Sequence, residues 1–276
     1  MTRFSVGLLV LLTTFSAYAA RLPLWELGGG IGYGKIPYYR GSASSRDVVL
    51  PLPLAIYRGK KYGVDREGAH RWLFKNPRFR LDLSLALGLP VPQSAKIKAR
   101  EGMPNLDTLL EAGPVLDVLI WKNNRQSFSA HFPLRLAVSL SWKHLGYQGG
   151  VFAPYLHYSI KSFQHNYWEF NLSLGPTFGS KAYHDYYYSV DSQYKTDQRG
   201  EYSATAGYSG SRATIYINKR LGKLWMSVFA RYDVLDGAVF VHSPLVEKAH
   251  YLIGGLVIGW IFADSRRTVY VDKASW

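Results

Sequence analysis

SFSAHFPLRLAVSLSW is the sequence of residues 127–142. Its even-numbered positions, from Phe128 to Trp142, are all apolar, whereas most of its odd-numbered positions carry hydroxyl, imidazole or guanidinium groups. Because successive side chains of a strand point to opposite faces, this stretch predicts a β-strand with one apolar and one polar face. At about 3.3 Å per residue and a tilt of about 40°, it is long enough to cross the roughly 30 Å apolar core of a bilayer. Strands of soluble sheets usually have only about five or six residues, so the length favours a membrane strand.

The same two-residue period recurs at 79–89, 152–160, 168–178 and 224–234. In each of these segments one face is rich in leucine or aromatic residues and the other is polar or charged, as expected with lipid outside and water or a polar network inside. The sequence therefore predicts an all-β fold, a transmembrane antiparallel up-and-down β-barrel of about twelve strands, within a range of about ten to fourteen. The expected strands lie near 25–34, 48–57, 61–67, 78–89, 109–121, 127–142, 149–161, 167–179, 201–209, 211–220, 223–234 and 250–262.

Turns and longer connections separate these strands. Ser209-Gly210 is one predicted hairpin turn, and long connections are expected at 90–108, 180–200 and 236–249. With about twelve strands and both ends of the barrel in the periplasm, the first two long connections would lie on the periplasmic side. Phe262 would be the terminal aromatic residue, unless 268–276 forms an extra strand that ends at Trp276.

The amino terminus has the pattern of a secretory signal. Arg3 precedes a short apolar stretch, Val6 to Leu12, and Ala17-Tyr18-Ala19 is a small-x-small cleavage site. Residues 1–19 are therefore predicted to be a signal peptide, and 20–276 to be a single barrel domain. An uncleaved anchor is disfavoured because the apolar stretch is much shorter than the about 20 residues that a membrane helix needs. A secreted chain with many long amphipathic strands is expected in the Gram-negative outer membrane.

Composition agrees with this location. Aromatic residues make up 15% of the chain, and the mean hydropathy of -0.10 fits a polar lumen that offsets a lipid face. The formal net charge is +14, of which residues 1–19 contribute only Arg3 among charged side chains. Such a charge favours anionic partners such as outer-membrane lipopolysaccharide, peptidoglycan carboxylates or acidic proteins. Nucleic acid is disfavoured as a partner because the chain is predicted to be secreted.

The polar face of the strands predicts a network of charges of both signs inside the barrel. Mixed signs can pair across a barrel of this size, so we expect a small or closed pore. No cofactor is expected, and the eight histidines lack the spacing of a metal site. The residues expected in this lumen network are Arg78, Arg80, Asp82, Glu111, Asp117, Arg135, His157, Lys161, Glu169, Arg231 and Asp233.

A catalytic reading of the lumen is weaker than a structural one. His157-Tyr158-Ser159, with Glu169 across the next hairpin, has the outline of a lipid A deacylase site. All three polar residues share lumen parity, whereas an enzyme that acts on a membrane lipid needs them on the lipid side or at the rim. We therefore expect no catalytic residues and no enzymatic activity.

The segment 180–200 contains a tyrosine-rich run. Tyrosine supplies large, rigid contact area, so Tyr183, Tyr186, Tyr187 and Tyr188 are candidates for contact with a protein partner. An interface girdle or a folded plug explains the same run equally well.

The chain also resembles the MipA/OmpV family of outer-membrane proteins, the MltA-interacting proteins. The resemblance is carried by Pro37–Ser42, Pro51–Pro53, Tyr202–Tyr208, Arg231–Ala238 and Ser243–Val246, in this order. It implies a scaffold that bridges a membrane-bound lytic transglycosylase and a bifunctional murein synthase in peptidoglycan remodelling. The alternatives are a small outer-membrane channel and, less favoured, a lipid A-modifying barrel enzyme.

Overall fold

The structure is a computed structural model that describes residues 20–59, 62–65, 68–71, 74–141, 145–162 and 168–271. The predicted signal peptide and the residues after Val271 lie outside these ranges. Its long strands are β2 (Trp25–Pro37), β3 (Ser45–Arg58), β7 (Phe79–Gly88), β8 (Thr108–Lys122), β9 (Gln126–Leu140), β10 (Leu145–Phe152), β11 (Tyr155–Ser162), β12 (Trp168–Gly179), β13 (Gly207–Leu221), β14 (Leu224–Val234) and β15 (His250–Asp264).

Shorter elements complete the fold. The short strands are β1 (Ala20–Pro23), β4 (Tyr62–Asp65), β5 (Gly68–Arg71), β6 (Phe74–Lys75) and β16 (Thr268–Val271). One α-helix, α1 (Lys181–Tyr188), lies among the described residues together with the 3-10 turns η1 (Gln93–Ala95), η2 (Lys98–Arg100) and η3 (Ser192–Tyr194).

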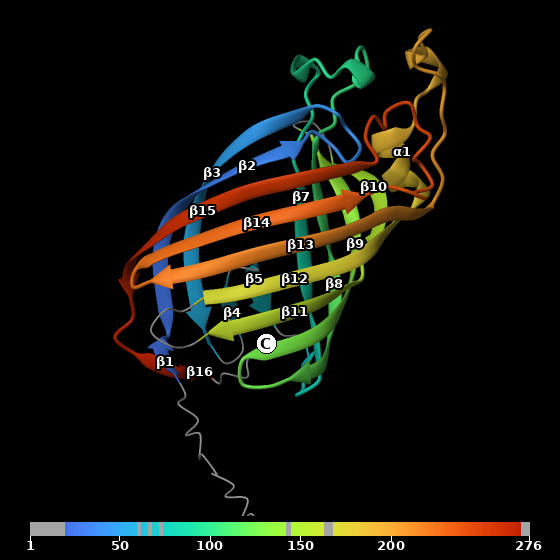
Figure 1. Cartoon of the computed structure of the whole chain (residues 1–276). Helices are drawn as coiled ribbons and strands as arrows, with labels where there is room; N and C mark the ends of the chain where they lie inside the picture. The colour runs from blue at the N-terminus through green and yellow to red at the C-terminus, as the bar shows by residue number, and fades with distance from the viewer. Residues whose placement is uncertain are drawn as a thin grey trace, which may run out of the picture.

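The strands form an antiparallel sheet that curves into the predicted barrel (Figure 1). This sheet has fourteen strands, in the order β5-β4-β3-β2-β15-β14-β13-β12-β10-β9-β8-β7-β6, with β11 beside β9 and β12. Consecutive long strands pair with each other in the predicted up-and-down order, apart from β3 and β7, and from β10 and β11, which both lie between β9 and β12. The all-β barrel fold is thereby confirmed.

Two predicted strand boundaries differ from the structure. The segment predicted as one strand at 149–161 is divided into β10 and β11 at Ala153-Pro154, although both parts pair with β9 and β12. Proline has no amide hydrogen to donate to a ladder, which explains the break. Conversely, the predicted strands 201–209 and 211–220 are wrong as separate elements, because a single strand, β13, runs from Gly207 to Leu221. Gly210 has a φ of +92°, and the register against β12 shifts here, so the predicted turn is a β-bulge.

The two faces of the strands follow the predicted parity. On β9, Leu134 is 54% exposed, whereas Ser129, His131 and Ser139 are buried inside the barrel. Leu85 on β7 and Leu256 on β15 are likewise exposed on the outside. The outer surface is therefore apolar and the lumen is polar, as a membrane barrel requires.

The first and last long strands close the barrel against each other. β15 pairs with β2 along most of its length, from Gly254↔Lys35 to Asp264↔Glu26. A methyl group on Gly30 would lie 2.6 Å from the carbonyl oxygen of Ile258, so the glycine allows the two strands to approach closely. Thr268–Val271 does form a strand, but it pairs with β1 outside the main sheet.

The sheet ends at the short strands β5 and β6, and along most of their length β3 and β7 have no strand on this side among the described residues. The amide of Arg58 donates to the Leu24 carbonyl, so the even-numbered amides of β3 face β2. The nitrogens of Pro51 and Pro53, at odd-numbered positions, therefore face the other edge of β3. Proline is tolerated at such an edge because it has no hydrogen to donate. Among the described residues no ladder joins β3 to β7, and one hydrogen bond, from Arg46 Nη1 to the Pro90 carbonyl at 2.7 Å, links the two sides.

Four long connections lie at one end of the barrel, whereas the connection from β3 to β7, which contains β4, β5 and β6, leaves β3 at the other end. The segments 38–44, 89–107, 180–206 and 235–249 gather opposite the end that carries β1 and β16 (Figure 1). The expectation that two of them lie at the end of the termini is wrong. It came from counting 61–67 as a full membrane strand, which shifts the alternation of strand direction for the two connections that follow it.

Candidate functional site

The buried hydrophobic core of the molecule lies outside the barrel wall. The four segments 38–44, 89–107, 180–206 and 235–249 pack together into a cap over one mouth of the barrel (Figure 1). Its core brings together side chains that are far apart in sequence, namely Tyr39, Val91, Ile97, Met103, Leu106, Tyr188, Val190, Ala204, Leu235, Ala238, Phe240 and Leu245. The barrel itself cannot supply such a core, because its apolar face points outward to lipid.

Helix α1 anchors the cap in the mouth of the barrel. Its first residues are capped by Ser180, whose hydroxyl accepts hydrogen bonds from the amides of Tyr183, at 3.3 Å, and Gly150, at 3.0 Å. Lys181 and Asp185 form an ion pair one turn apart, and Ser189 donates to the same carboxylate. The tyrosine-rich run is therefore a short capped helix that bonds to β10.

The four tyrosines proposed as partner contacts lie in this helix and pack into the cap. Their hydroxyl groups tie the helix to other segments: Tyr183 donates to Glu111 at 3.0 Å, Tyr186 to the Asp107 carbonyl and Tyr188 to the Arg40 carbonyl. The Tyr188 ring stacks on Phe240 with 3.7 Å between centroids, and Tyr188 is only 3% exposed. Burial raises the pKa of Tyr186 to about 12 and also raises the pKa of Tyr188, so both stay neutral. The tyrosine-rich run is therefore a folded part of the cap.

His184 lies on the same face of α1 as Tyr188, in contact with Phe240, and is completely buried. Its Nδ1 lies 2.5 Å from the Thr205 carbonyl oxygen, and its Nε2 lies 2.6 Å from the Ser209 hydroxyl. A carbonyl can only accept, so Nδ1 carries the hydrogen and Nε2 accepts from Ser209. Burial lowers the pKa of His184 from its ordinary value. The neutral ring thus joins the cap to the bulge in β13.

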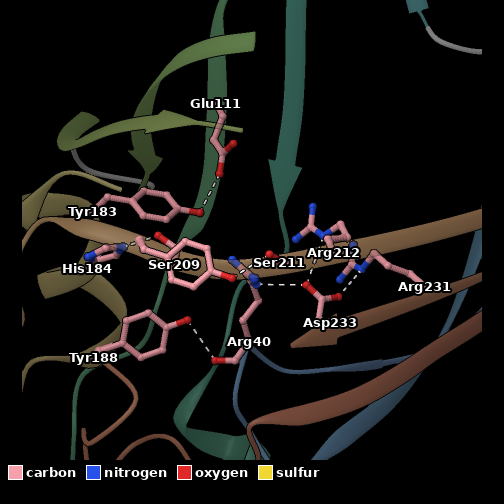
Figure 2. A network of polar contacts seen from close by, with 11 residues as sticks. Arg40, Glu111, Tyr183, His184, Tyr188, Ser209, Ser211, Arg212, Arg231 and Asp233 are labelled. Carbon is pink, nitrogen blue, oxygen red and sulfur yellow. Dashed lines mark hydrogen bonds and ion pairs between the residues drawn. The ribbon is translucent and has the colours of Figure 1, made fainter. Parts of the chain in front are cut away.

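Below the cap, three arginines surround one aspartate (Figure 2). Asp233 on β14 is fully buried, and its carboxylate is approached by Nε of Arg231 at 2.7 Å, of Arg212 at 3.2 Å and of Arg40 at 3.2 Å. These residues come from β13, β14 and the turn after β2. We call Arg40, Arg212, Arg231 and Asp233 the arginine cluster.

A second polar chain runs across the lower lumen. Arg80 forms an ion pair with Asp117 at 2.7 Å, Asp117 accepts from His131 Nδ1 at 2.6 Å, and His131 Nε2 lies 2.8 Å from the Ser129 hydroxyl. The order of these last three groups is that of an acid, a base and a nucleophile. Ser129 is 4% exposed, however, and the cavity below is lined by Asp117 and His131 but not by Ser129. The arrangement therefore offers the hydroxyl no open approach to a substrate.

The lumen between these two networks contains a cavity of about 380 Å³. Charged and aromatic side chains from several strands line it, among them Arg80, Arg135, Tyr155, His157, Arg212 and Tyr216. Arg135 also donates to Ser84 and forms an ion pair with Glu111 at 2.9 Å.

The other predicted lumen residues have mixed positions. Asp82 is buried on the lumen side of β7, and Glu169 pairs with Lys161 at 3.3 Å. Arg78 is wrongly placed by the prediction, because it lies exposed in the turn before β7. Parity alone cannot show where a strand begins, and Arg78 lies one residue outside it.

The deacylase outline does not come together. His157 Nδ1 lies 2.9 Å from the Ser173 hydroxyl, and Glu169 is engaged by Lys161 and by Asn218. Ser159 is buried, and its hydroxyl has no hydrogen-bond partner among the described residues.

Sequence reasoning missed two members of the arginine cluster. Arg212 has the same parity as Tyr216 and Asn218 on β13, and this signal could have placed it in the lumen. Arg40 lies in a turn, where no period applies. Across the described ranges there is no group of three or more metal-ligating side chains, and no described helix is long and apolar enough to cross a membrane.

Comparisons with known proteins give one sequence match. A family model described as MltA-interacting protein MipA matches residues 27–262. A search of curated protein sequences finds no significant match.

Several solved structures are similar to the chain. One, described as a bacterial polysaccharide outer membrane secretin, has a TM-score of 0.37 and 10% identity, covering 87% of this chain and 99% of that chain. The NanC porin has a TM-score of 0.34 and 7% identity, with coverage of 87% and 99%. A Pseudomonas aeruginosa FadL homologue has a TM-score of 0.33 and 6% identity, with coverage of 87% and 90%.

Proposed function

The chain belongs to the MltA-interacting protein family, whose model matches residues 27–262, and from this premise we propose that it is a non-enzymatic scaffold for peptidoglycan remodelling. It is an outer-membrane barrel protein. Its proposed partners are a membrane-bound lytic transglycosylase, after which the family is named, and a bifunctional murein synthase. The family match is the observation that carries the proposal.

The arrangement of the connections indicates which end would hold such a partner. Outer-membrane barrels have short turns on the periplasmic side and longer loops outside. The turns at Asn123–Arg125 and Gly222–Lys223 are short and lie at the end of the termini, whereas the cap lies at the other end. On this rule β1 and β16 face the periplasm, where murein enzymes work, and the cap faces outward.

We therefore propose a docking surface at the end of the termini in place of segment 180–200. The tyrosines of α1 are engaged inside the cap, and Tyr188 has almost no accessible surface. The end of the termini carries a set of exposed cationic side chains, which suit an acidic protein surface. These are Arg78, Arg125, Lys223, Arg266 and Arg267.

Charge reversal at this end tests the proposal. The double variant Arg266→Glu and Arg267→Glu should lower capture of a purified lytic transglycosylase about threefold or more and weaken its salt dependence, because two rim charges each contribute up to about 1 kcal/mol. Pull-down from detergent at several salt concentrations measures both effects.

A matched control lies in the cap. Lys96→Glu with Lys98→Glu changes two exposed lysines by the same charge and should leave capture unchanged. If the cap variant loses capture and the other does not, the docking surface is in the cap. If the parent binds no transglycosylase and conducts ions in planar bilayers, the channel alternative replaces the scaffold.

A further inference from the structure

We propose that the arginine cluster and the cavity beside it form a binding site for an oxyanion, the carboxylate or phosphate group of a small polar solute. The cluster lies next to the cap, where the Tyr188 hydroxyl bonds to the Arg40 carbonyl (Figure 2). The proposal is independent of the scaffold function, since it concerns the lumen and not the docking surface.

The first argument is charge. Arg40, Arg212 and Arg231 carry three positive charges, and Asp233 supplies the only carboxylate with which they form ion pairs among the described residues. Cationic charge inside a protein is unfavourable unless it is paired, so the excess attracts an anion.

The second argument is the geometry of the donors. All three arginines use Nε to approach Asp233. The Nη groups of Arg212 and Arg231 have no hydrogen-bond partner within the described ranges. Arg40 and the buried Tyr251 hydroxyl interact with each other, so the terminal donors left for a ligand are those of Arg212 and Arg231. Guanidinium groups with free terminal nitrogens are suited to bidentate contact with carboxylate or phosphate.

The third argument is access. Arg212 lies on the lumen face of β13 and lines the cavity of about 380 Å³. Its side chain is 36% accessible although it lies inside the barrel, so its accessible part faces this cavity. A ligand in this cavity would therefore meet the arginine cluster through Arg212, the member of the cluster that lines it.

The other residues that line the cavity indicate the chemistry of the rest of the ligand. Tyr155, Tyr216 and Thr214 contribute flat rings and hydroxyl groups, and the charged part of the wall combines Arg80, paired with Asp117, with Arg135, paired with Glu111. Such a mixture fits a small polar molecule with hydroxyl groups and one anionic group better than a purely apolar one.

Calorimetric titration of the folded barrel in detergent tests the site. The probes are sodium phosphate, sodium glucuronate and the neutral sugar glucose, all at constant ionic strength. We expect saturable binding of at least one oxyanion and none of glucose, and the oxyanion that binds identifies the source as a phosphate or a carboxylate. Arg212→Gln should weaken this binding about tenfold, because it removes a charge-assisted donor pair.

Two further variants separate a binding role from a structural one. Asp233→Asn removes the competing carboxylate and should tighten oxyanion binding, whereas a purely structural cluster would show no binding to tighten. Lys195→Gln changes an exposed lysine of the cap and should bind as the parent does. Each variant is first checked for the folded barrel on an unboiled gel, and Arg231→Gln replaces Arg212→Gln if the latter does not fold. Absence of saturable binding, or binding that neither lumen arginine variant weakens, overturns the proposal.

Discussion

Leu134 and Val115 lie on neighbouring strands, but their side chains have opposite surroundings. Leu134 on β9 is 54% exposed on the outer face, near the middle of its strand. Val115 on β8 faces the cavity, pairs with Asp82 across the ladder and lies two residues from Asp117. A cation is therefore far better placed at residue 115 than at residue 134.

Arginine substitution at these two positions tests the assignment of the faces. Leu134→Arg should destabilise the barrel by about 2 to 4 kcal/mol, since a charge near the bilayer midplane loses its hydration. Val115→Arg should cost much less, because acidic groups and the cavity accept it. Folding yield in lipid vesicles measures the difference, and equal yields would show that the faces are assigned wrongly.

Parity predicted much of the lumen at the level of single residues. Arg80, Asp117, Arg135 and Asp233 are inside because their strands alternate without interruption. Alternation cannot report depth or crowding: Ser139 has lumen parity but is buried against Gln148, with no space for a larger side chain. Nor could it find Arg40, which contributes to the arginine cluster from a turn.

Among the elements, α1 is the one that its local sequence pattern could not predict. Half of its eight residues are tyrosine, and the segment is too short to display a helical period, so the run reads equally well as a loop. The helix is specified by the Ser180 cap and by contacts with Glu111, Asp107 and Arg40 from other segments. Strands, in contrast, are long and two-sided, which is why they could be predicted.

The burial of His184 predicts that the cap loosens in acid. Its pKa is lowered in the folded state, so the unfolded cap binds more protons as the pH falls below the ordinary value of about 6.5. Stability contributed by the neutral ring is present above this pH and is lost below it. Hydrogen exchange of the cap amides, corrected for intrinsic rates, should become faster between about pH 7 and pH 5.

The variant His184→Gln provides the comparison. A glutamine can still donate to the Thr205 carbonyl and accept from Ser209, but it does not titrate. Its cap should exchange somewhat faster than that of the parent at neutral pH, and the acid-induced increase should disappear. An increase that persists in the variant would assign the effect to another group.

At the level of the whole molecule, the barrel and the cap are stabilised in different ways, because the barrel lies in lipid and the cap lies in water. The barrel is held by ladders and lumen ion pairs beneath an apolar surface, whereas the cap has its own buried core. The barrel wall has ten long strands when β10 and β11 are counted as one, and this number lies within the predicted range. The position of the cap could not be predicted, because it depends on the exact number of crossings.

The long antiparallel ladders of the barrel predict a heat-modifiable protein. Unboiled material should migrate differently from boiled material in a denaturing gel, because the antiparallel ladder resists detergent until it is heated. Circular dichroism of the unboiled form should be dominated by β-structure. A helix-rich spectrum, or recovery of the protein in the soluble periplasm, would contradict the fold.

The scattered origin of the cap core has a consequence for biogenesis. Tyr39, Leu106, Tyr188 and Phe240 come from four separate connections, and each can reach the others only when the hairpins between them are in place. Burial of this core therefore marks the completion of assembly, since no partial set of hairpins can produce it. The time at which the cap becomes resistant to protease would therefore report when the last step of membrane insertion is complete.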